Sequence, residues 1–172
     1  MCYEENMREI EKSMENLRVS GIYDVDKYAC SLKHQTSQLE FFYCNLVKDQ
    51  NFDETFYYLN KRPKEGQIAY FNIGRGFPKE LMDGHWCYIL KDLGYKAIVI
   101  PTTSIKEDSK ECNEHYEMDI LVRNKKRILE SRIQLSEIRS VDLQRIDSRK
   151  RYRSVVTPRQ EILEFVRKNL FE

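Results

Sequence analysis

This sequence of 172 residues contains little glycine, proline or histidine, with 6, 4 and 3 residues respectively. That scarcity, and the lack of any repeat or low-complexity tract, excludes collagen-like and proline-rich disordered chains. The 5 cysteines are odd in number, widely spaced and never in a Cys-x-x-Cys pair, so a disulfide framework or zinc site is not expected. They are Cys2, Cys30, Cys44, Cys87 and Cys112. The sequence therefore predicts no metal and no cofactor.

Long apolar runs are missing as well. No stretch approaches the roughly 18 apolar residues of a membrane helix, and the opening MCYEENMREIEK is too acidic for a secretory signal. The sequence has no Walker loop, Gly-x-Ser-x-Gly elbow or dinucleotide fingerprint. We therefore expect a cytoplasmic protein that keeps its thiols reduced and does not bind a membrane.

The charge is unevenly distributed although the net charge is only +1. Residues 1–65 carry 9 basic and 12 acidic side chains, whereas residues 121–172 carry 14 basic and 7 acidic ones. Five cations crowd one short segment, namely Arg145, Arg149, Lys150, Arg151 and Arg153. Such a segment either holds phosphates by charge or forms a solvated face, and the sequence leaves both interpretations open.

The first 60 residues have the pattern of amphipathic helices. Apolar side chains recur in steps of three and four along residues 7–17 and again along residues 28–46, interrupted only by Gln35. The apolar seam consists of Met7, Ile10, Met14, Leu17, Tyr28, Leu32, Leu39, Phe42 and Leu46. Ser20 and Gly21 separate two helices, and Asp24 is expected to cap the second. A third short helix is expected at residues 53–59.

The polar residues 61–66, which include Pro63 and Gly66, predict a domain boundary. We expect a helical hairpin region at residues 1–62 and an α+β domain at residues 63–172. Short strands are predicted at residues 67–73, 86–90, 96–100, 119–122, 127–135 and 138–141. Their length and spacing predict a small, partly closed barrel. A closing helix is expected to begin with Thr157 as N-cap, Pro158 at the first position and Gln160 completing a capping box.

Residues 66–104 carry the most specific pattern in the chain. A glycine-containing excursion between the first two strands ends at His85, and the third strand runs into Pro101, Thr102, Thr103 and Ser104. We expect strand pairing to stop at this proline and its hydroxyl-bearing neighbours. A loop, an imidazole and hydroxyls at strand ends form the kind of pocket that binds a phosphate and moves protons around it.

This order of elements resembles the PemK/MazF family of toxin endoribonucleases. In that family a first strand precedes a long glycine-containing loop, the next strand opens with Arg-Pro or His-Trp/Pro, and the third ends in a Pro-x-Thr-Ser type turn, as residues 100–104 do here. Residues 135–146, LSEIRSVDLQRI, look like the late strand of the family. The resemblance covers roughly residues 66–170 and none of the first 65.

The resemblance implies an SH3-like barrel of the CcdB/PemK type that cleaves single-stranded RNA without a metal and leaves a 2′,3′-cyclic phosphate. Thr103 stands at the catalytic threonine position, with Ser104 beside it. His85 stands where the family often has arginine, and this exchange shifts its implied role toward proton transfer, since imidazole titrates near neutral pH. The residues implied in binding RNA or phosphate are Arg75, Lys79, Gln134, Ser136, Arg139 and Arg145. A homodimer restrained by an antitoxin protein is also implied.

The sequence departs from the family pattern at the late strand. Ser136 takes the place of an acid, and Glu137 takes the place of the following Gln, so the acid is absent or displaced by one residue. In a strand, that displacement turns the side chain to the other face. His85 also has a simpler interpretation, as a donor to a backbone carbonyl, and Thr103 and Ser104 have one as strand terminators.

Two other functions stay open at this point. One is a barrel that binds RNA or protein after its nuclease site has decayed, and the other is a gyrase poison of the CcdB type, which needs neither His85 nor Thr103. The N-terminal helices either cover the RNA groove or enlarge the dimer interface. The acidic balance of residues 1–65 favours docking on the basic segment.

Overall fold

The computed structural model describes residues 2–47, 61–77 and 79–172. The chain divides into two compact units, Met1–Phe52 and Asp53–Glu172. This division falls among residues that the structure does not describe, so the predicted boundary after residue 62 stays a prediction. The short helix predicted at residues 53–59 also lies outside the described residues.

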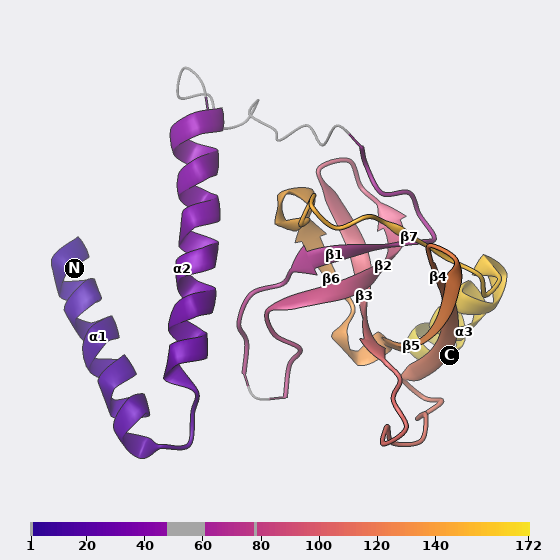
Figure 1. Cartoon of the computed structure of the whole chain (residues 1–172), viewed down its shortest axis with the longest axis horizontal. Coiled ribbons are helices and arrows are strands. Elements are labelled where there is room, and N and C mark those ends of the chain that lie inside the picture. The colour runs from indigo at the N-terminus through magenta and orange to yellow at the C-terminus, as the bar shows by residue number, and fades with distance from the viewer. Residues whose placement is uncertain (1, 48–60, 78) are drawn as a thin grey trace. The chain divides into compact units, whose positions relative to one another are not determined.

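The first unit contains two α-helices, α1 (Tyr3–Ser20) and α2 (Val25–Phe41), followed by a π-helical turn at Phe42–Leu46 (Figure 1). Gly21 ends α1 with a φ of 66°, a left-handed conformation that glycine adopts without strain. The Asp24 side chain accepts a hydrogen bond of 2.9 Å from the Lys27 N–H and caps α2. The predicted break and cap are thus confirmed. No residue of either helix is buried.

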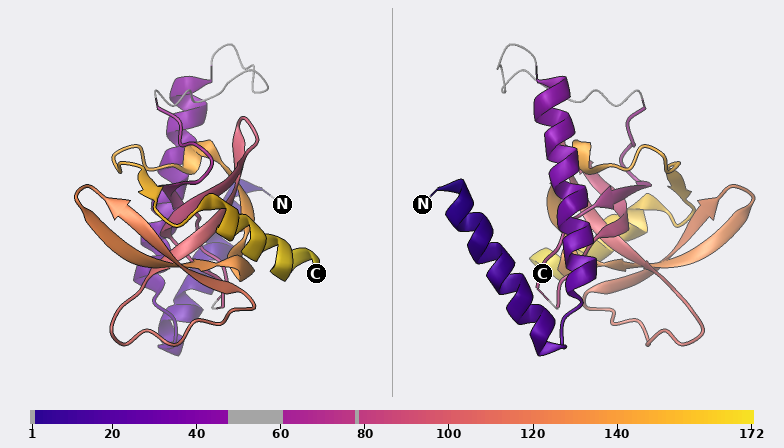
Figure 2. Two further views of the ribbon diagram at one scale, coloured as in Figure 1. Left: turned by 90° about the vertical axis from the view of Figure 1, so that its right-hand side faces the viewer. Right: turned by 60° about the vertical axis from the view of Figure 1, so that its left-hand side comes forward.

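The second unit is a closed, six-stranded antiparallel barrel, in which the strands follow one another as β1-β2-β3-β5-β4-β7 and return to β1 (Figures 1 and 2). A further strand, β6 (Arg139–Asp142), pairs with β3 outside this circuit. The barrel strands are β1 (Gln67–Asn72), β2 (Gly84–Asp92), β3 (Lys96–Ser104), β4 (Glu117–Asn124), β5 (Arg127–Gln134) and β7 (Arg153–Val155). The predicted α+β barrel is therefore confirmed at the level of its architecture.

Both faces of β1, β2 and β3 are buried, because two apolar clusters share these strands. One cluster fills the barrel, where Tyr88 packs with Ile162 and Val166 of the closing helix α3 (Arg159–Phe171). The other cluster, with Phe71 and Cys87, lies outside the barrel wall beneath β6 and the segment that follows it. Side chains alternate along a strand, so neighbours on β2 point into the barrel and out of it in turn.

The third strand is longer than predicted, because β3 continues through Pro101 to Ser104. The expectation that pairing stops at the proline is wrong. Pro101 pairs with Cys87 of β2, but it lies where the other edge of β3 changes partner from β6 to β5. A missing backbone N–H interrupts no ladder at such a point.

The start of the closing helix also differs from the prediction. Pro158 is the N-cap and makes no side-chain cap bond, while the Thr157 hydroxyl accepts a hydrogen bond of 2.8 Å from the Leu121 N–H. Gln160 donates to Glu164 at 3.1 Å, so no capping box forms. The local pattern assigned the Thr157 hydroxyl to the helix, but this hydroxyl bonds the backbone of β4 instead.

Residues 61–66 are attached to the barrel in the second unit. Pro63 is buried, Arg62 donates to the Asp92 carboxylate at 2.8 Å, and Glu65 accepts from Arg159 at 2.9 Å. The Tyr152 hydroxyl donates to the Lys61 carbonyl at 2.6 Å. This polar segment is therefore part of the folded unit.

Candidate active site

His85 and Thr103 belong to one cross-strand row on the barrel wall. His85 pairs with Phe71 of β1, and Thr103 pairs with Arg132 of β5. Trp86 and Thr102 are the pair at this end of the ladder between β2 and β3, and His85 and Thr103 are the next residues on their strands. Their side chains therefore project from neighbouring strand positions on the same side of the wall.

The row faces outward from the barrel. His85 shares its side of β2 with Cys87, and Thr103 shares its side of β3 with Pro101, the residue that pairs with Cys87. Both His85 and Thr103 are half-buried and therefore accessible. Ser104, the next residue on β3, points to the opposite face, so the structure separates this hydroxyl from the imidazole.

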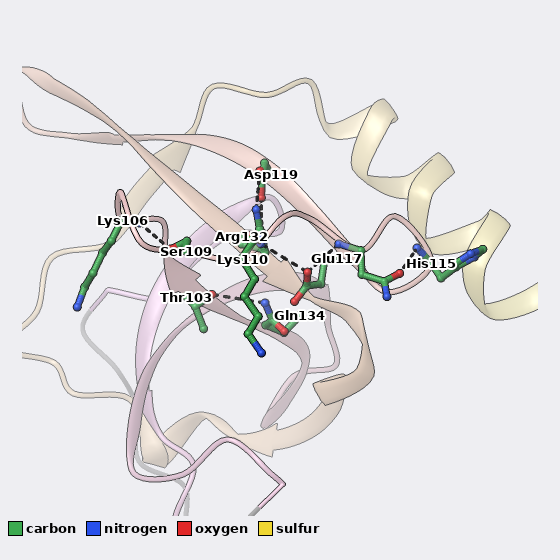
Figure 3. A network of polar contacts seen from close by, with 10 residues as sticks. Thr103, Lys106, Ser109, Lys110, His115, Glu117, Asp119, Arg132 and Gln134 are labelled. Atoms are coloured by element: carbon green, nitrogen blue, oxygen red, sulfur yellow. Dashed lines mark hydrogen bonds and ion pairs between the residues drawn. The ribbon is translucent and has the colours of Figure 1, made fainter.

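Thr103 lies beside a group of polar contacts and is joined to one of its residues, Gln134 (Figure 3). The Gln134 amide donates to the Thr103 hydroxyl at 3.4 Å. Beside it, Arg132 binds both oxygens of Asp119 at 2.6 and 3.0 Å and donates to the Lys110 carbonyl at 2.6 Å. These hydrogen bonds with Asp119 raise the pKa of Arg132 above its ordinary value. The network ties the segment after β3 to the hairpin of β4 and β5.

Sequence reasoning missed Arg132 and Asp119, although a signal was present. The turn at Lys125 and Lys126 joins β4 to β5, and counting back from it places Asp119 directly opposite Arg132. Residues of opposite charge at facing positions of a hairpin are expected to pair. The hairpin register would therefore have predicted this ion pair.

The acid at position 137 is held close to the loop before β2. Residues Leu135–Glu137 form a 3-10 turn and not a strand. The expectation that a displacement by one residue turns the acid to the other face of a strand is therefore wrong. Arg139 donates to the Glu137 carboxylate at 2.5 Å, and the Leu81 N–H donates to the same oxygen at 3.2 Å. The Glu137 side chain is 13% exposed. It links β6 to the glycine-containing loop.

Arg139 and Arg145 place positive charge near Cys87 and Asn72, two residues close to His85 in the sheet. Arg139 lies close enough to Cys87, two residues along β2, for its charge to act on the thiol. Arg145 donates to the Asn72 carbonyl at 3.3 Å, and Asn72 pairs with Gly84, immediately before His85. Arg139 belongs to β6, and Arg145 reaches the end of β1 from the 3-10 turn Leu143–Arg145.

Cys87, beneath the row, is not a nucleophile at neutral pH. It is fully buried, and burial raises the pKa of its thiol to about 12 although the charge of Arg139 opposes the shift. A thiol with such a pKa stays protonated, and the thiolate is the reactive form.

Charged side chains of the loop between β1 and β2 bind partners within the same loop. The Arg75 guanidinium lies 3.0 Å from the Asp83 carboxylate and its side chain is only 9% exposed. The Glu80 carboxylate accepts from the Phe77 N–H at 3.0 Å, and a Cβ on Gly76 would lie 1.8 Å from it. The anion that this loop holds is thus a carboxylate of the same chain.

The structure joins some of the predicted site residues and leaves others apart. His85, Thr103 and Gln134 lie together, with Arg139 and Arg145 at the flanks. Lys79 is exposed in the loop and Ser136 is exposed in the 3-10 turn. The candidates that the structure does not bring into the row are Ser104, Ser136, Arg75 and Lys79.

Within residues 2–47, 61–77 and 79–172, no three His, Cys, Asp or Glu side chains are grouped so that they could hold a metal ion. Nor does this described part of the chain contain a helix long and apolar enough to cross a membrane. Comparison with models of known protein families gave no match, and no curated protein matched the chain.

Proposed function

We propose that this protein is a PemK/MazF-like, metal-independent endoribonuclease that cleaves single-stranded RNA, on an SH3-like barrel of the CcdB/PemK type. The observation that carries the proposal is that His85 and Thr103 follow directly on the pair between Trp86 and Thr102, so that an imidazole and a hydroxyl project from neighbouring strands on one accessible face. A proton acceptor beside a hydrogen-bond donor is the minimum that cleavage by the 2′-hydroxyl requires.

In the proposed reaction His85 takes the proton from the 2′-hydroxyl of the nucleotide before the cut. The 2′-oxygen attacks phosphorus, the bond from phosphorus to the 5′-oxygen breaks, and a solvent proton neutralises the leaving oxygen. The products are a 2′,3′-cyclic phosphate and a 5′-hydroxyl. Thr103, held by Gln134, donates to a non-bridging phosphate oxygen as its negative charge grows.

Positive charge for the phosphate comes from the flanking arginines. Arg139 uses Nε and Nη2 to bind Glu137, while its Nη1 makes no hydrogen bond within the described residues. Arg145 has no carboxylate partner in that part of the chain and is half-buried at the β1 side. Single strands fit this role because their bases can be turned out and bound individually.

A second function has one observation in its favour. Arg75, the loop cation expected to meet the phosphate, is engaged with Asp83 and largely buried. A barrel whose nuclease site has decayed would keep RNA binding through Arg139 and Arg145 but would lack cleavage. The two functions differ in whether bound RNA is cut.

The cellular setting belongs to the same proposal. A cytoplasmic homodimer restrained by an antitoxin protein follows from the family resemblance. The exposed apolar seam of the N-terminal helices supports an enlarged dimer interface, since Ile10 is 39% exposed and Leu39 51% exposed. Association of two copies would remove this apolar surface from water.

Cleavage of mixed-sequence RNA by the purified protein in EDTA tests the proposed function. The proposal expects fragments that accumulate with time and enzyme concentration. Binding of the same RNA without cleavage would support the decayed barrel, and neither binding nor cleavage would contradict both functions. The His85→Ala protein, prepared in parallel, serves to exclude a contaminating ribonuclease.

A further inference from the structure

A second cluster of aromatic and basic side chains lies on the inner side of β1 and β2. The rings of Tyr70 and Trp86 meet edge to face with centroids 5.2 Å apart. The Arg153 guanidinium of β7 lies 3.5 Å from the centre of the Trp86 ring, and the Lys150 ammonium lies 5.7 Å from that of Tyr70. In the sequence, Arg153 and Lys150 stand out only as members of the basic segment at residues 145–153.

Arg153 has no anionic partner in the described part of the chain. Its guanidinium makes no hydrogen bond or ion pair there, whereas Arg132, Arg139 and Arg159 each bind a carboxylate within 3.0 Å. Burial lowers the pKa of Arg153, although an arginine remains charged. A partly desolvated cation without a counter-ion is costly, so the cluster is suited to accept an anion.

The backbone also makes room for these rings. Gly84 precedes His85 on β2, and a Cβ at Gly84 would lie 2.3 Å from the Tyr70 hydroxyl. Tyr70, Trp86 and Arg153 are only half-buried and Lys150 is exposed, so a ligand can reach the cluster. Aromatic faces beside cations are the combination that binds the bases and phosphates of single strands.

We infer that Tyr70, Trp86, Arg153 and Lys150 form a nucleotide-binding site for single-stranded RNA. Arg153 and Lys150 hold phosphate oxygens, and a base stacks on the exposed aromatic surface. This inference rests on the proposed function, because it supplies that nuclease with a second contact to its substrate. His85 and Trp86 are neighbours on opposite faces of β2, so the nucleotide bound here lies away from the bond that is cut.

Trp86 is the only tryptophan in the sequence, so intrinsic fluorescence reports directly on this site. The probe is a fluorescein-labelled 2′-O-methyl oligonucleotide of mixed sequence, which binds as RNA does but lacks the attacking hydroxyl. Its anisotropy gives Kd, and an unlabelled copy gives the change in Trp86 emission. We expect saturable quenching of Trp86 with the same Kd, and a Kd that weakens as salt rises.

Matched variants separate this site from general electrostatics. Arg153→Gln and Arg127→Gln change the net charge equally, but Arg127 is exposed at the far end of the β4–β5 hairpin. We expect Arg153→Gln to weaken binding about tenfold and to lower the salt slope by about one, and Arg127→Gln to change Kd less than twofold. Lys150→Gln and Lys126→Gln form a second pair, and Lys150→Gln, at an exposed position, tests the site without disturbing Trp86 packing.

The inference fails if the oligonucleotide binds by anisotropy while Trp86 emission stays constant, or if both members of each pair weaken binding equally. It also fails if the oligonucleotide does not bind at all. Its failure is distinguishable from that of the proposed function, because the probe is never cleaved. Quenching without RNA cleavage would support this site and contradict the proposed function. Cleavage with unchanged KM in both Arg153→Gln and Lys150→Gln would support the proposed function and contradict this site.

Discussion

His85 of β2 and Thr103 of β3 each lie one residue beyond the pair formed by Trp86 and Thr102, and both face outward from the barrel. Their relation depends on register alone. A slip of one residue between β2 and β3 would turn one of the two side chains toward the barrel interior. The buried pairs along the same strands, such as Tyr88 with Ile100, hold the register and therefore hold the site.

The first prediction concerns the two residues of this pair. His85→Ala and Thr103→Val should each lower the rate of RNA cleavage by about two to four orders of magnitude, since each removes a proton-transfer or charge-stabilising group. Ser104→Ala, one residue along β3 but on the other face, should change the rate less than fivefold. Circular dichroism and the unfolding midpoint verify the fold, and equal losses in Thr103→Val and Ser104→Ala would contradict the assignment.

The second prediction concerns the stability that Arg132 provides. Arg132→Met should lower the free energy of unfolding by about 1.5–3 kcal/mol, because it removes charged hydrogen bonds to Asp119 and the Lys110 carbonyl. Asp119 is 45% exposed and can be hydrated, which limits the loss. Urea denaturation measures the effect. Arg123→Met, at an exposed position on β4, should stay within about 0.5 kcal/mol, and equal losses in the two variants would refute the role of the network.

The third prediction concerns the thiols. At pH 8.5 in the folded protein, iodoacetamide should alkylate the exposed Cys2, Cys30 and Cys44 and leave Cys87 unmodified, because burial raises the pKa of that thiol from 9.0 to about 12. The protonated form is thus favoured by folding, and this contribution to stability is lost as pH rises from about 9 toward 12. Peptide mass mapping identifies the alkylated cysteines. Labelling of Cys87 at the rate of Cys44 would contradict the prediction and show that the apolar cluster around Cys87 opens.

The fourth prediction concerns the N-terminal helices. A protein that begins at Lys61 keeps the contacts of Lys61 and Arg62 with the barrel unit. If the exposed apolar seam of α1 and α2 enlarges the dimer, light scattering should show that the truncated protein is a monomer, with less RNA cleavage. A truncated dimer with faster cleavage would show instead that the helices cover the RNA groove. A truncated dimer with unchanged cleavage would exclude both roles.

Much of the barrel follows from local pattern in the sequence. Six of the seven strands coincide with predicted runs, because short β-rich segments alternate with turns at regular spacing. Gly21 ends α1 and Asp24 caps the start of α2 for purely local reasons. Strand β7 was missed because its three residues, Arg153 to Val155, are too few for alternation to show. Its existence depends on pairing with β1 and β4, far away in sequence.

The site was predictable only in part, because tertiary contacts decide which of its residues come together. Residue type and order single out His85 and Thr103, but the strand that extends past Pro101 decides that Thr103 faces outward and Ser104 inward. Arg75 was expected at the phosphate because of its position in a loop, and the acid Asp83, eight residues later, binds it instead. No local pattern reports which partner a loop cation selects.

The most direct test of the central claim is the chemistry of the RNA ends. An oligoribonucleotide cut by the full chain in EDTA, analysed by mass spectrometry, should yield a 2′,3′-cyclic phosphate and a 5′-hydroxyl. A copy with a single 2′-deoxy sugar before the cut should stay intact at that bond, and His85→Ala should leave both uncut. A 5′-phosphate product, or cutting of the bond that follows the deoxy sugar, would contradict the account.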